Sequence, residues 1–432
     1  MPAKAHGLHV AVIGGGWAGL AAAVRACEAG HQLELFEMAG QLGGRARSLP
    51  PDEAGLRLDN GQHILIGAYR RSLALMRHLG LAPEAALLRL PLRLRYPGHE
   101  GLRLPPGAAL PAFVRGVLAC RRWPWSARLG LLLGATGWLL RGFRCAPGLS
   151  VAELCKNLPQ PVKDELIDPL CVAALNTPAA QASASVFLRV LHDALFNGPG
   201  SSDLLLPRRP LSELLAEPAQ AWLLGQGAVL RLSQRVQSLT RSAEGGWQVD
   251  GQAFDRVILA CSAAEAARLT ASLSAPPAPA WSAQAAALHY QPIITVYLQH
   301  PGPAWPAPML ALQEGPQAPA QFAFDLGQLS AEAAGRSAWV ISGAAPWVER
   351  GLDAAAEAVR QQAQQELGWT EAPTLIRVLA EKRATFACTP GLQRPPAAIA
   401  PGLWAAGDYV AGPYPATLEG AVLAGEFAAA NL

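Results

Sequence analysis

The sequence has few charged residues for its length. Asp, Glu, Lys and Arg make up 16% of the 432 residues, and the formal net charge is only +3. A protein that binds the phosphates of a nucleic acid usually carries a larger positive net charge. We therefore expect no nucleic-acid partner.

Metal and disulfide signatures are also missing. The nine histidines show no HExxH spacing and the seven cysteines contain no CxxC pair, so we predict no metal site. An odd number of cysteines without a secretion signal indicates reduced thiols in a cytosol. The apolar run at residues 8–13 ends in glycines instead of a cleavage site, which again favours a cytoplasmic protein.

No apolar run is long enough to cross a bilayer, which takes about 18 residues or more. The nearest candidate, residues 129–140, is bounded by Arg128 and Arg141. Apolar residues nevertheless make up 51% of the chain. Its length predicts two or three globular domains with large cores.

The N-terminal sequence has the order strand, glycine turn, helix, strand, acid. An apolar strand at 8–13 is followed by GGGWAG at 14–19, a helix at 20–29, a second strand at 33–36, and Glu37. The first glycine of such a motif permits the tight turn, the second lets a pyrophosphate approach the backbone, and the third lets helix and strand pack closely. The helix N-terminus offers N–H groups to phosphates, and the acid binds a ribose 2′-hydroxyl. The pattern predicts a site for FAD or NAD, because Glu37 would repel the extra phosphate of NADP.

Two further glycine motifs separate FAD from NAD. The first, QLGGR at 41–45, brings backbone close to a ligand, and Arg45 can pair with a phosphate. Near the C-terminus, a strand at 403–406 leads to Gly407 and Asp408, and a helix of small residues follows at 416–430. At this point the sequence resembles the flavin amine oxidase and phytoene desaturase superfamily. That resemblance implies FAD and an α/β fold, with a Rossmann-like FAD-binding domain of the GR2 type and an inserted α+β substrate domain.

The resemblance also implies roles for single residues. Asp408 would bind the ribityl–pyrophosphate part of FAD, and the helix after it would point its positive end at the flavin pyrimidine. Gly61 and Gln62 would lie beside the flavin ring. The backbone at Val236 would meet adenine, although a plain core valine looks the same in sequence. The residues that we expect to contact FAD are Gly14, Gly16, Trp17, Ala18, Gly19, Glu37, Gly43, Gly44, Arg45, Gly61, Gln62, His63, Val236, Gly407, Asp408, Ala416 and Thr417.

The domain division follows from these motifs. We expect the FAD-binding domain at 1–75, 206–274 and 376–432, and the substrate domain at 76–205 and 275–375. In the FAD-binding domain we expect a strand at 229–232 and a hairpin of 247–249 with 257–260, turning at Asp250 and Gly251. In the substrate domain we expect a hairpin at 92–104 and strands at 293–298 and 339–342.

One insert has an unusual charge distribution. Residues 101–152 contain no Asp or Glu. They do contain Arg103, Arg115, Arg121, Arg122, Arg128, Arg141 and Arg144, with Trp123, Trp125 and Trp138 among leucines. Arginine and tryptophan beside an apolar face are typical of a helix that lies in a membrane surface. We expect a peripheral protein on the inner face of the cytoplasmic membrane; the alternative is a helical lobe with a solvated basic face.

The NGQH segment at 60–63 and the ALNTP segment at 174–178 are much more specific than the FAD motifs. Together with further matches, they make up a set of six segments. They are 58–69 (LDNGQHILIGAY), 168–171 (DPLC), 174–178 (ALNTP), 202–205 (SDLL), 381–386 (EKRATF) and 415–421 (PATLEGA). They resemble the hydroxysqualene dehydroxylase family of squalene and hopanoid biosynthesis. That resemblance implies a C30 isoprenoid substrate, hydroxysqualene, which loses an allylic hydroxyl and gains a hydride from reduced FAD. The reaction requires an acid, near-attack geometry and a dry apolar cavity.

Two residues are candidates for the acid that protonates the hydroxyl. His63 follows the glycine loop that would lie beside the flavin, and its ordinary pKa suits proton donation. Asp325 follows a strand-like segment at 322–324. We expect Asp59 to brace its loop instead. Cys388 is expected to be a buried free thiol and not a covalent flavin anchor.

Three alternatives stay open. A carotenoid-type desaturase would oxidise a lipid on the same fold. An amine oxidase usually carries a lysine near flavin N5, where this chain is expected to have Thr295. A non-catalytic flavin protein would only scaffold the squalene-forming synthases. No second GxGxxG motif follows a strand, so electrons must come from NAD(P)H or a separate reductase.

Overall fold

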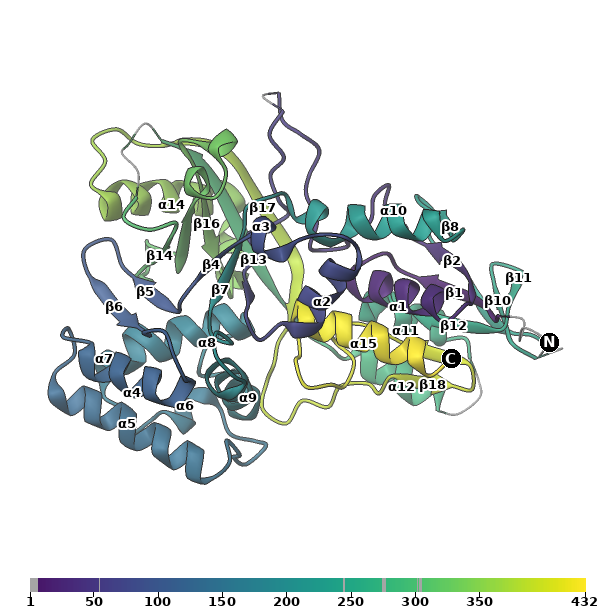
Figure 1. Ribbon diagram of the computed structural model, residues 1–432, viewed down its shortest axis with the longest axis horizontal. Helices are drawn as coiled ribbons and strands as arrows, with labels where there is room; N and C mark the ends of the chain where they lie inside the picture. Colours follow the sequence, from purple (N-terminus) through teal and green to yellow (C-terminus); the bar gives the residue numbers. More distant parts are fainter. Residues whose placement is uncertain (1–6, 54, 244, 274–276, 301, 303–304) are drawn as a thin grey trace.

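The computed structural model describes all residues except 1–6, 54, 244, 274–276, 301, 303 and 304. Two halves lie side by side in Figure 1. One half surrounds strand β1 (His9–Ile13) and helix α15 (Leu418–Ala430). The other contains strand β13 (Tyr290–Gln299) and, below it in the view, a lobe of helices.

The first half is built on a six-stranded sheet. The strand order is β18, β19, β12, β1, β2, β8. Their bounds are Ala398–Ala400, Leu403–Ala405, Arg256–Leu259, His9–Ile13, Gln32–Phe36 and Val229–Arg231. All neighbouring pairs are parallel except β18 with β19. Strands from the start, middle and end of the chain therefore share one sheet, and their largely apolar, buried sequences suit a parallel sheet.

Helix α1 (Trp17–Glu28) packs against α15 through small residues. A Cβ atom on Gly425 would lie 2.1 Å from the carbonyl oxygen of Ala18, so the two helices can approach this closely only with glycine there. The expected helix at 416–430 begins at Leu418, because Thr417 is extended and caps it, accepting a hydrogen bond from the Gly420 N–H at 3.0 Å. The purple and yellow ribbons of α1 and α15 lie side by side in Figure 1.

The other helices of this half are short. They are α2 (Arg70–His78), α3 (Pro83–Ala86), η2 (Ser212–Ala216), α10 (Glu217–Gly225), α11 (Ala263–Thr270) and α12 (Ala278–Ala286).

The hairpin expected around Asp250 differs from the prediction. Strand β10 (Trp247–Val249) pairs with β11 (Gln252–Phe254), and β9 (Leu239–Arg241) completes a small antiparallel sheet. The apolar run at 257–260 does not return along β10. It belongs to β12 and enters the parallel sheet beside β1, because four buried apolar residues suit a central parallel strand better than a solvated hairpin arm.

The second half is built on a five-stranded antiparallel sheet. Its order is β14, β15, β16, β13, β17, with bounds Met309–Ala311, Phe322–Asp325, Arg336–Ile341, Tyr290–Gln299 and Thr374–Phe386. The strands predicted at 293–298 and 339–342 lie in β13 and at the end of β16. Helices α13 (Ala345–Arg350) and α14 (Leu352–Leu367) pack on this sheet.

Smaller elements join the halves. Strands β3 (Leu65–Ile66), β7 (Leu204–Pro207) and β4 (Leu87–Leu90) form one sheet. The hairpin predicted at 92–104 is present as β5 (Arg93–Arg95) and β6 (Glu100–Arg103). The helical lobe contains α4 (Ala109–Ala119), α5 (Trp125–Leu140), α6 (Val151–Leu154), α7 (Gln160–Val162), η1 (Lys163–Ile167), α8 (Asp168–Leu175) and α9 (Ala184–Phe196).

The expected domain boundaries stay a prediction. Two of them fall inside strands, since β7 spans residues 205 and 206 and β17 spans residues 375 and 376. None of the described helices combines the length and the apolar character that crossing a bilayer would take.

Candidate active site

A cavity of about 980 Å³ lies between the two sheets and extends into the helical lobe. One end is lined by the glycine-rich turn after β1 and by Glu37 at the end of β2. The other end is lined by apolar side chains such as Leu102, Phe113 and Leu131. Of the residues expected to contact FAD, all except Gly19 line this cavity.

The three glycines of the N-terminal motif differ in what a side chain would meet at their positions. Gly14 has φ +112°, and a Cβ there would lie 2.6 Å from Ala260 backbone atoms. A Cβ on Gly19 would lie 1.9 Å from the Gly14 carbonyl oxygen, so Gly19 serves helix packing. A Cβ on Gly16 would meet only the Cα of Gly44, at 3.8 Å. The described protein atoms therefore do not require glycine at position 16, which leaves this backbone open to a ligand in the cavity.

The N-terminus of α1 is open toward the cavity. Gly16 is its N-cap and no side chain caps the helix, while Trp17 and Ala18 line the cavity. Backbone N–H groups at such a terminus suit a pyrophosphate. The residues present therefore fit the phosphate part of a dinucleotide.

Glu37 is held by the glycine turn. Its carboxylate accepts the N–H of Gly15 at 2.7 Å through Oε2 and the N–H of Ala39 at 2.8 Å through Oε1. A carboxylate has about four acceptor positions, so the side chain can accept ribose hydroxyls as well. Val236, the expected adenine contact, also lines the cavity.

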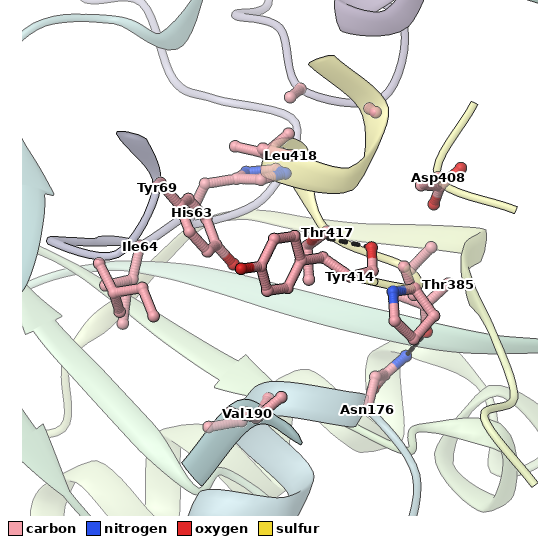
Figure 2. A pocket seen from close by; sticks show the side chains of 18 of the residues that line it. His63, Ile64, Tyr69, Asn176, Val190, Thr385, Asp408, Tyr414, Thr417 and Leu418 are labelled. Atoms are coloured by element: carbon pink, nitrogen blue, oxygen red, sulfur yellow. Dashed lines mark hydrogen bonds between the residues drawn. The ribbon is translucent and has the colours of Figure 1, made fainter. Parts of the chain in front are cut away.

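Arg45 is engaged by protein groups. Its guanidinium donates to Asp408 at 2.6 Å and to the Ala384 carbonyl at 2.6 Å. The simple expectation of a free arginine that pairs with a phosphate is therefore incomplete, because the ion pair orients both residues at the cavity wall. Asp408 projects from the loop after β19 (Figure 2).

The loop at 61–63 lies against β13. Gly61 has φ +116°, and a Cβ there would lie 3.6 Å from Oγ1 of Thr295. The His63 Nδ1 is 2.9 Å from the Gly61 carbonyl oxygen. A carbonyl can only accept, so Nδ1 carries the hydrogen. Burial lowers the pKa of His63 below its ordinary value, although the bond to Gly61 opposes this; the ring is neutral at neutral pH and Nε2 is its acceptor.

Asp59 braces this loop, as expected. Its Oδ1 accepts the Ser48 hydroxyl at 2.7 Å and the Leu211 N–H at 2.9 Å. Its carbonyl accepts the Tyr297 hydroxyl at 3.0 Å. Burial raises the pKa of Asp59 to about 6.

Asp325 is not part of the site, and its expected role as the acid is wrong. It does not line the cavity. Its carboxylate caps η3 (Leu326–Gln328), accepting the Gly327 N–H at 3.0 Å and the Gln328 side-chain amide at 2.9 Å. The strand pattern before it could not show that the strand end points away from the cavity.

Sequence reasoning missed a polar pair on the cavity wall. Asn176 ends α8 with φ 48°, and its Nδ2 donates to Oγ1 of Thr385 at 2.9 Å. Its Oδ1 accepts the Gly343 N–H at 2.6 Å. Because the Thr385 oxygen accepts from Asn176, its own hydrogen must point elsewhere, and Thr385 lines the cavity (Figure 2). The segments 174–178 and 381–386, which both carry the family resemblance, were the available signal.

A second missed cluster surrounds Asp193 on α9. Arg189 donates to its Oδ2 at 2.5 Å and His192 lies 2.7 Å from its Oδ1. Burial alone would raise the pKa of Asp193, but hydrogen bonds from Arg189, His192 and Tyr414 lower it below its ordinary value. Asp193 and Tyr414 both line the cavity, so a charged group and a phenol lie on its wall.

Cys388 is buried among apolar residues and does not line the cavity. Burial raises the pKa of its thiol to about 12. The geometry agrees with an inert thiol.

A family model described as flavin containing amine oxidoreductase matches residues 17–432. Hydroxysqualene dehydroxylase of Rhodopseudomonas palustris is 29% identical, with 97% of each chain aligned. The enzyme of the same name from Sinorhizobium fredii is 27% identical over 99% of this chain and 98% of that protein. A 15-cis-phytoene desaturase of Solanum lycopersicum is 25% identical over 57% of this chain and 46% of its own length.

Solved structures show the same fold at low identity. An oxidoreductase from Methanosarcina mazei superposes with a TM-score of 0.74 at 18% identity, covering 98% of this chain and all of the other. Cyclohexylamine oxidase from Brevibacterium oxydans gives a TM-score of 0.69 at 16% identity, with 98% of each chain covered. These structures confirm the predicted α/β flavin amine oxidase-like fold. The family match confirms the predicted cofactor, FAD.

Proposed function

Because the chain belongs to the flavin containing amine oxidoreductase family, we propose that this FAD-dependent oxidoreductase removes the hydroxyl of hydroxysqualene reductively, giving squalene for hopanoid biosynthesis. Full-length similarity to hydroxysqualene dehydroxylases supports the reaction. The observation that carries the proposal is the cavity itself. It continues from the glycine turn after β1 into an apolar part within the helical lobe, here called the sleeve.

The sleeve suits a long hydrocarbon. Its wall carries leucine and phenylalanine side chains from β6, α4, α5 and α9, including Leu102, Phe113, Leu131 and Leu195. Each buried CH₂ group of a ligand gains about 0.8 kcal/mol when it leaves water. Such a wall also excludes water, which protects a substrate cation from capture.

The reaction balances. The alcohol takes up two electrons and two protons and gives the hydrocarbon and water. The C–O bond breaks, a proton goes to the leaving oxygen and a C–H bond forms. Bound FAD supplies the hydride when it is reduced. Its electrons come from a donor that we propose to be a reduced nicotinamide or a separate reductase.

The polar groups of the cavity orient the hydroxyl. His63 remains the candidate acid, but its lowered pKa and its Nδ1–H bond to Gly61 mean that Nε2 must be protonated before it can donate. In its neutral form His63 accepts a hydrogen bond from the substrate hydroxyl. The Thr385 hydroxyl, held by Asn176, can donate one to the same oxygen.

Amine oxidation is disfavoured by the wall beside Gly61. The position expected to hold a lysine carries Thr295, and no lysine lines the described cavity. A carotenoid-type desaturation is the second candidate, because the similarity to phytoene desaturases covers over half of the chain. A flavin-binding scaffold without turnover would show the same cavity.

Parallel incubations separate these reactions. The purified flavoprotein is given hydroxysqualene with a reductant, a polyene precursor with an electron acceptor, or an alkylamine with oxygen. Squalene formed only in the first incubation supports the proposal. A more unsaturated polyene, an aldehyde, or no product in any incubation would each reject it.

A further inference from the structure

Helix α5 lies at the outer edge of the helical lobe (Figure 1). One side of this helix exposes a row of apolar side chains. The row consists of Trp125, Leu129, Leu133 and Leu140, whose exposed fractions are 62%, 52%, 74% and 83%. Spacings of four and seven residues place them on one side of the helix. Outside α4 and α5, the large exposed apolar residues of the described chain are scattered, for example Leu224 on α10 and Phe427 on α15.

Arginines lie at both ends of this row. Arg121 precedes α5, and Arg141 and Arg144 follow it; all three are exposed. Within the described ranges no carboxylate pairs with any of them, whereas Arg122 pairs with Glu165 at 2.9 Å. The row is therefore apolar in its middle and positive at its ends, with no acid in residues 101–152.

Arg128 is a different kind of residue. It is buried, donates to the carbonyls of Trp123 and Leu118 at 2.9 Å each, and stacks over Trp125 with its guanidinium 4.6 Å from the ring centre. It holds Trp125 in place instead of facing solvent. The aromatic end of the row is thus fixed by the protein.

The substrate cavity reaches the same face. Leu110 on α4 and Thr136 and Leu139 on α5 line the cavity and are also exposed. Thr136 lies between Leu133 and Leu140 on the side of the row. The cavity wall therefore reaches α4 and α5 beside the exposed leucines, at the place where we infer its opening.

We propose that the α5 row docks on an anionic bilayer and that the opening beside Leu110 and Leu139 is the portal through which the substrate passes between bilayer and cavity. The substrate class rests on the proposed function; the docking surface does not. Apolar side chains enter the interface, and the unpaired arginines contact lipid phosphates, the geometry of an interfacial helix.

Vesicle sedimentation tests the docking. The full-length FAD-loaded protein is mixed with vesicles of phosphatidylcholine, with or without phosphatidylglycerol. We expect binding that rises with the anionic lipid and falls about tenfold or more in Leu133→Glu/Leu140→Glu and in Arg141→Glu/Arg144→Glu. The matched controls, Leu224→Glu and Arg208→Glu/Arg209→Glu, should bind like the wild type. Wild-type protein that stays in the supernatant, or variants that bind as well as their controls, would overturn the proposal.

A second copy of the chain is the competing occupant of this face. Analytical ultracentrifugation of the same variants identifies it. A dimer that Leu133→Glu/Leu140→Glu converts to monomer, without vesicle binding by the wild type, would overturn membrane docking in favour of self-association.

Substrate loading tests the portal without turnover. The oxidised protein, which cannot reduce the substrate, is incubated with anionic vesicles that contain hydroxysqualene, re-isolated, and analysed for bound lipid by mass spectrometry. Leu139→Trp narrows the opening and should load about tenfold more slowly while sedimenting normally. Leu133 lies on the row but does not line the cavity, so the Leu133→Trp variant should take up substrate at the wild-type rate. Equal loading by both variants would overturn the portal, and failure to find squalene in a separate turnover assay would reject the proposed reaction alone.

Discussion

Arg45 and Asp408 stand 363 positions apart in the sequence, yet their side chains form an ion pair of 2.6 Å at the wall of the cavity. The pair joins the glycine segment after β2 to the loop after β19. The two segments that were predicted to contact FAD, 41–45 and 407–408, are therefore joined in one structural unit. Its two partners also face the same cavity as the glycine turn.

Breaking this pair should weaken FAD binding. Asp408→Asn leaves Arg45 without its carboxylate, and Arg45→Met leaves Asp408 alone. We expect each single variant to raise the FAD dissociation constant about tenfold or more. The dissociation constant of the double variant should not exceed that of the weaker-binding single variant, which corresponds to a coupling energy between the two residues of about 1–3 kcal/mol. Titration of the apoprotein with FAD measures this, with the exposed Glu349→Ala as control. Additive effects would show that the pair is not a unit.

Gly16 should matter to the ligand and not to the fold. Its φ of −73° is open to any residue, and a Cβ has room among the protein atoms. Gly16→Ala should therefore leave the melting temperature of the apoprotein within a few degrees of wild type. The added methyl would stand where we expect the FAD pyrophosphate to approach the backbone, so FAD affinity should fall about 10- to 100-fold. Gly225→Ala, where a Cβ meets nothing, is the control. An apoprotein of Gly16→Ala that is strongly destabilised would contradict this reading.

His63→Ala should remove turnover and keep the cofactor. General acid–base catalysis typically contributes about 100-fold or more, and we expect a loss of this size with an unchanged bound-flavin spectrum. Stopped-flow measurement of product formation tests it. Wild-type turnover in the variant would remove His63 from the mechanism.

Asp59 should make stability depend on pH. Because its pKa rises to about 6 in the folded chain from about 3.9 when unfolded, the folded state holds the proton more tightly. The resulting stabilisation is fully present below pH ~4 and is lost as pH rises through ~6, by at most about 3 kcal/mol. Asp59→Asn keeps an acceptor for Ser48 and Leu211 and should not show this loss. Urea unfolding of both proteins at pH 4.5 and 7.5 gives the difference; parallel pH dependence in the two would disprove the assignment.

The sequence predicted the parts of the site that depend on local chain geometry. Glycines at fixed spacing between a strand and a helix can be recognised because the turn, the helix packing and the ligand approach each require a missing Cβ. The structure places Gly14, Gly16, Gly43 and Gly44 together at one end of the cavity. The α/β fold followed from the same motifs.

Residues brought together only by tertiary contacts could not be predicted. Asn176 and Thr385 are 209 positions apart, and nothing in either segment alone shows that one side chain orients the other. Asp325 failed for the opposite reason, because a carboxylate after a strand looks the same whether it faces a cavity or caps a turn. The return strand of the 247–249 hairpin was missed because Gln252–Phe254 is short and the apolar run after it gave the stronger signal.

Single turnover of the reduced enzyme shows whether the flavin hydride replaces the hydroxyl of hydroxysqualene. The flavoprotein is photoreduced without oxygen, mixed with one equivalent of hydroxysqualene, and followed by flavin absorbance and by mass spectrometry of the extracted lipid. We expect flavin oxidation and squalene formation to proceed together, with one squalene formed per flavin. Flavin that stays reduced beside unchanged hydroxysqualene, or beside a dehydrated polyene, would contradict it.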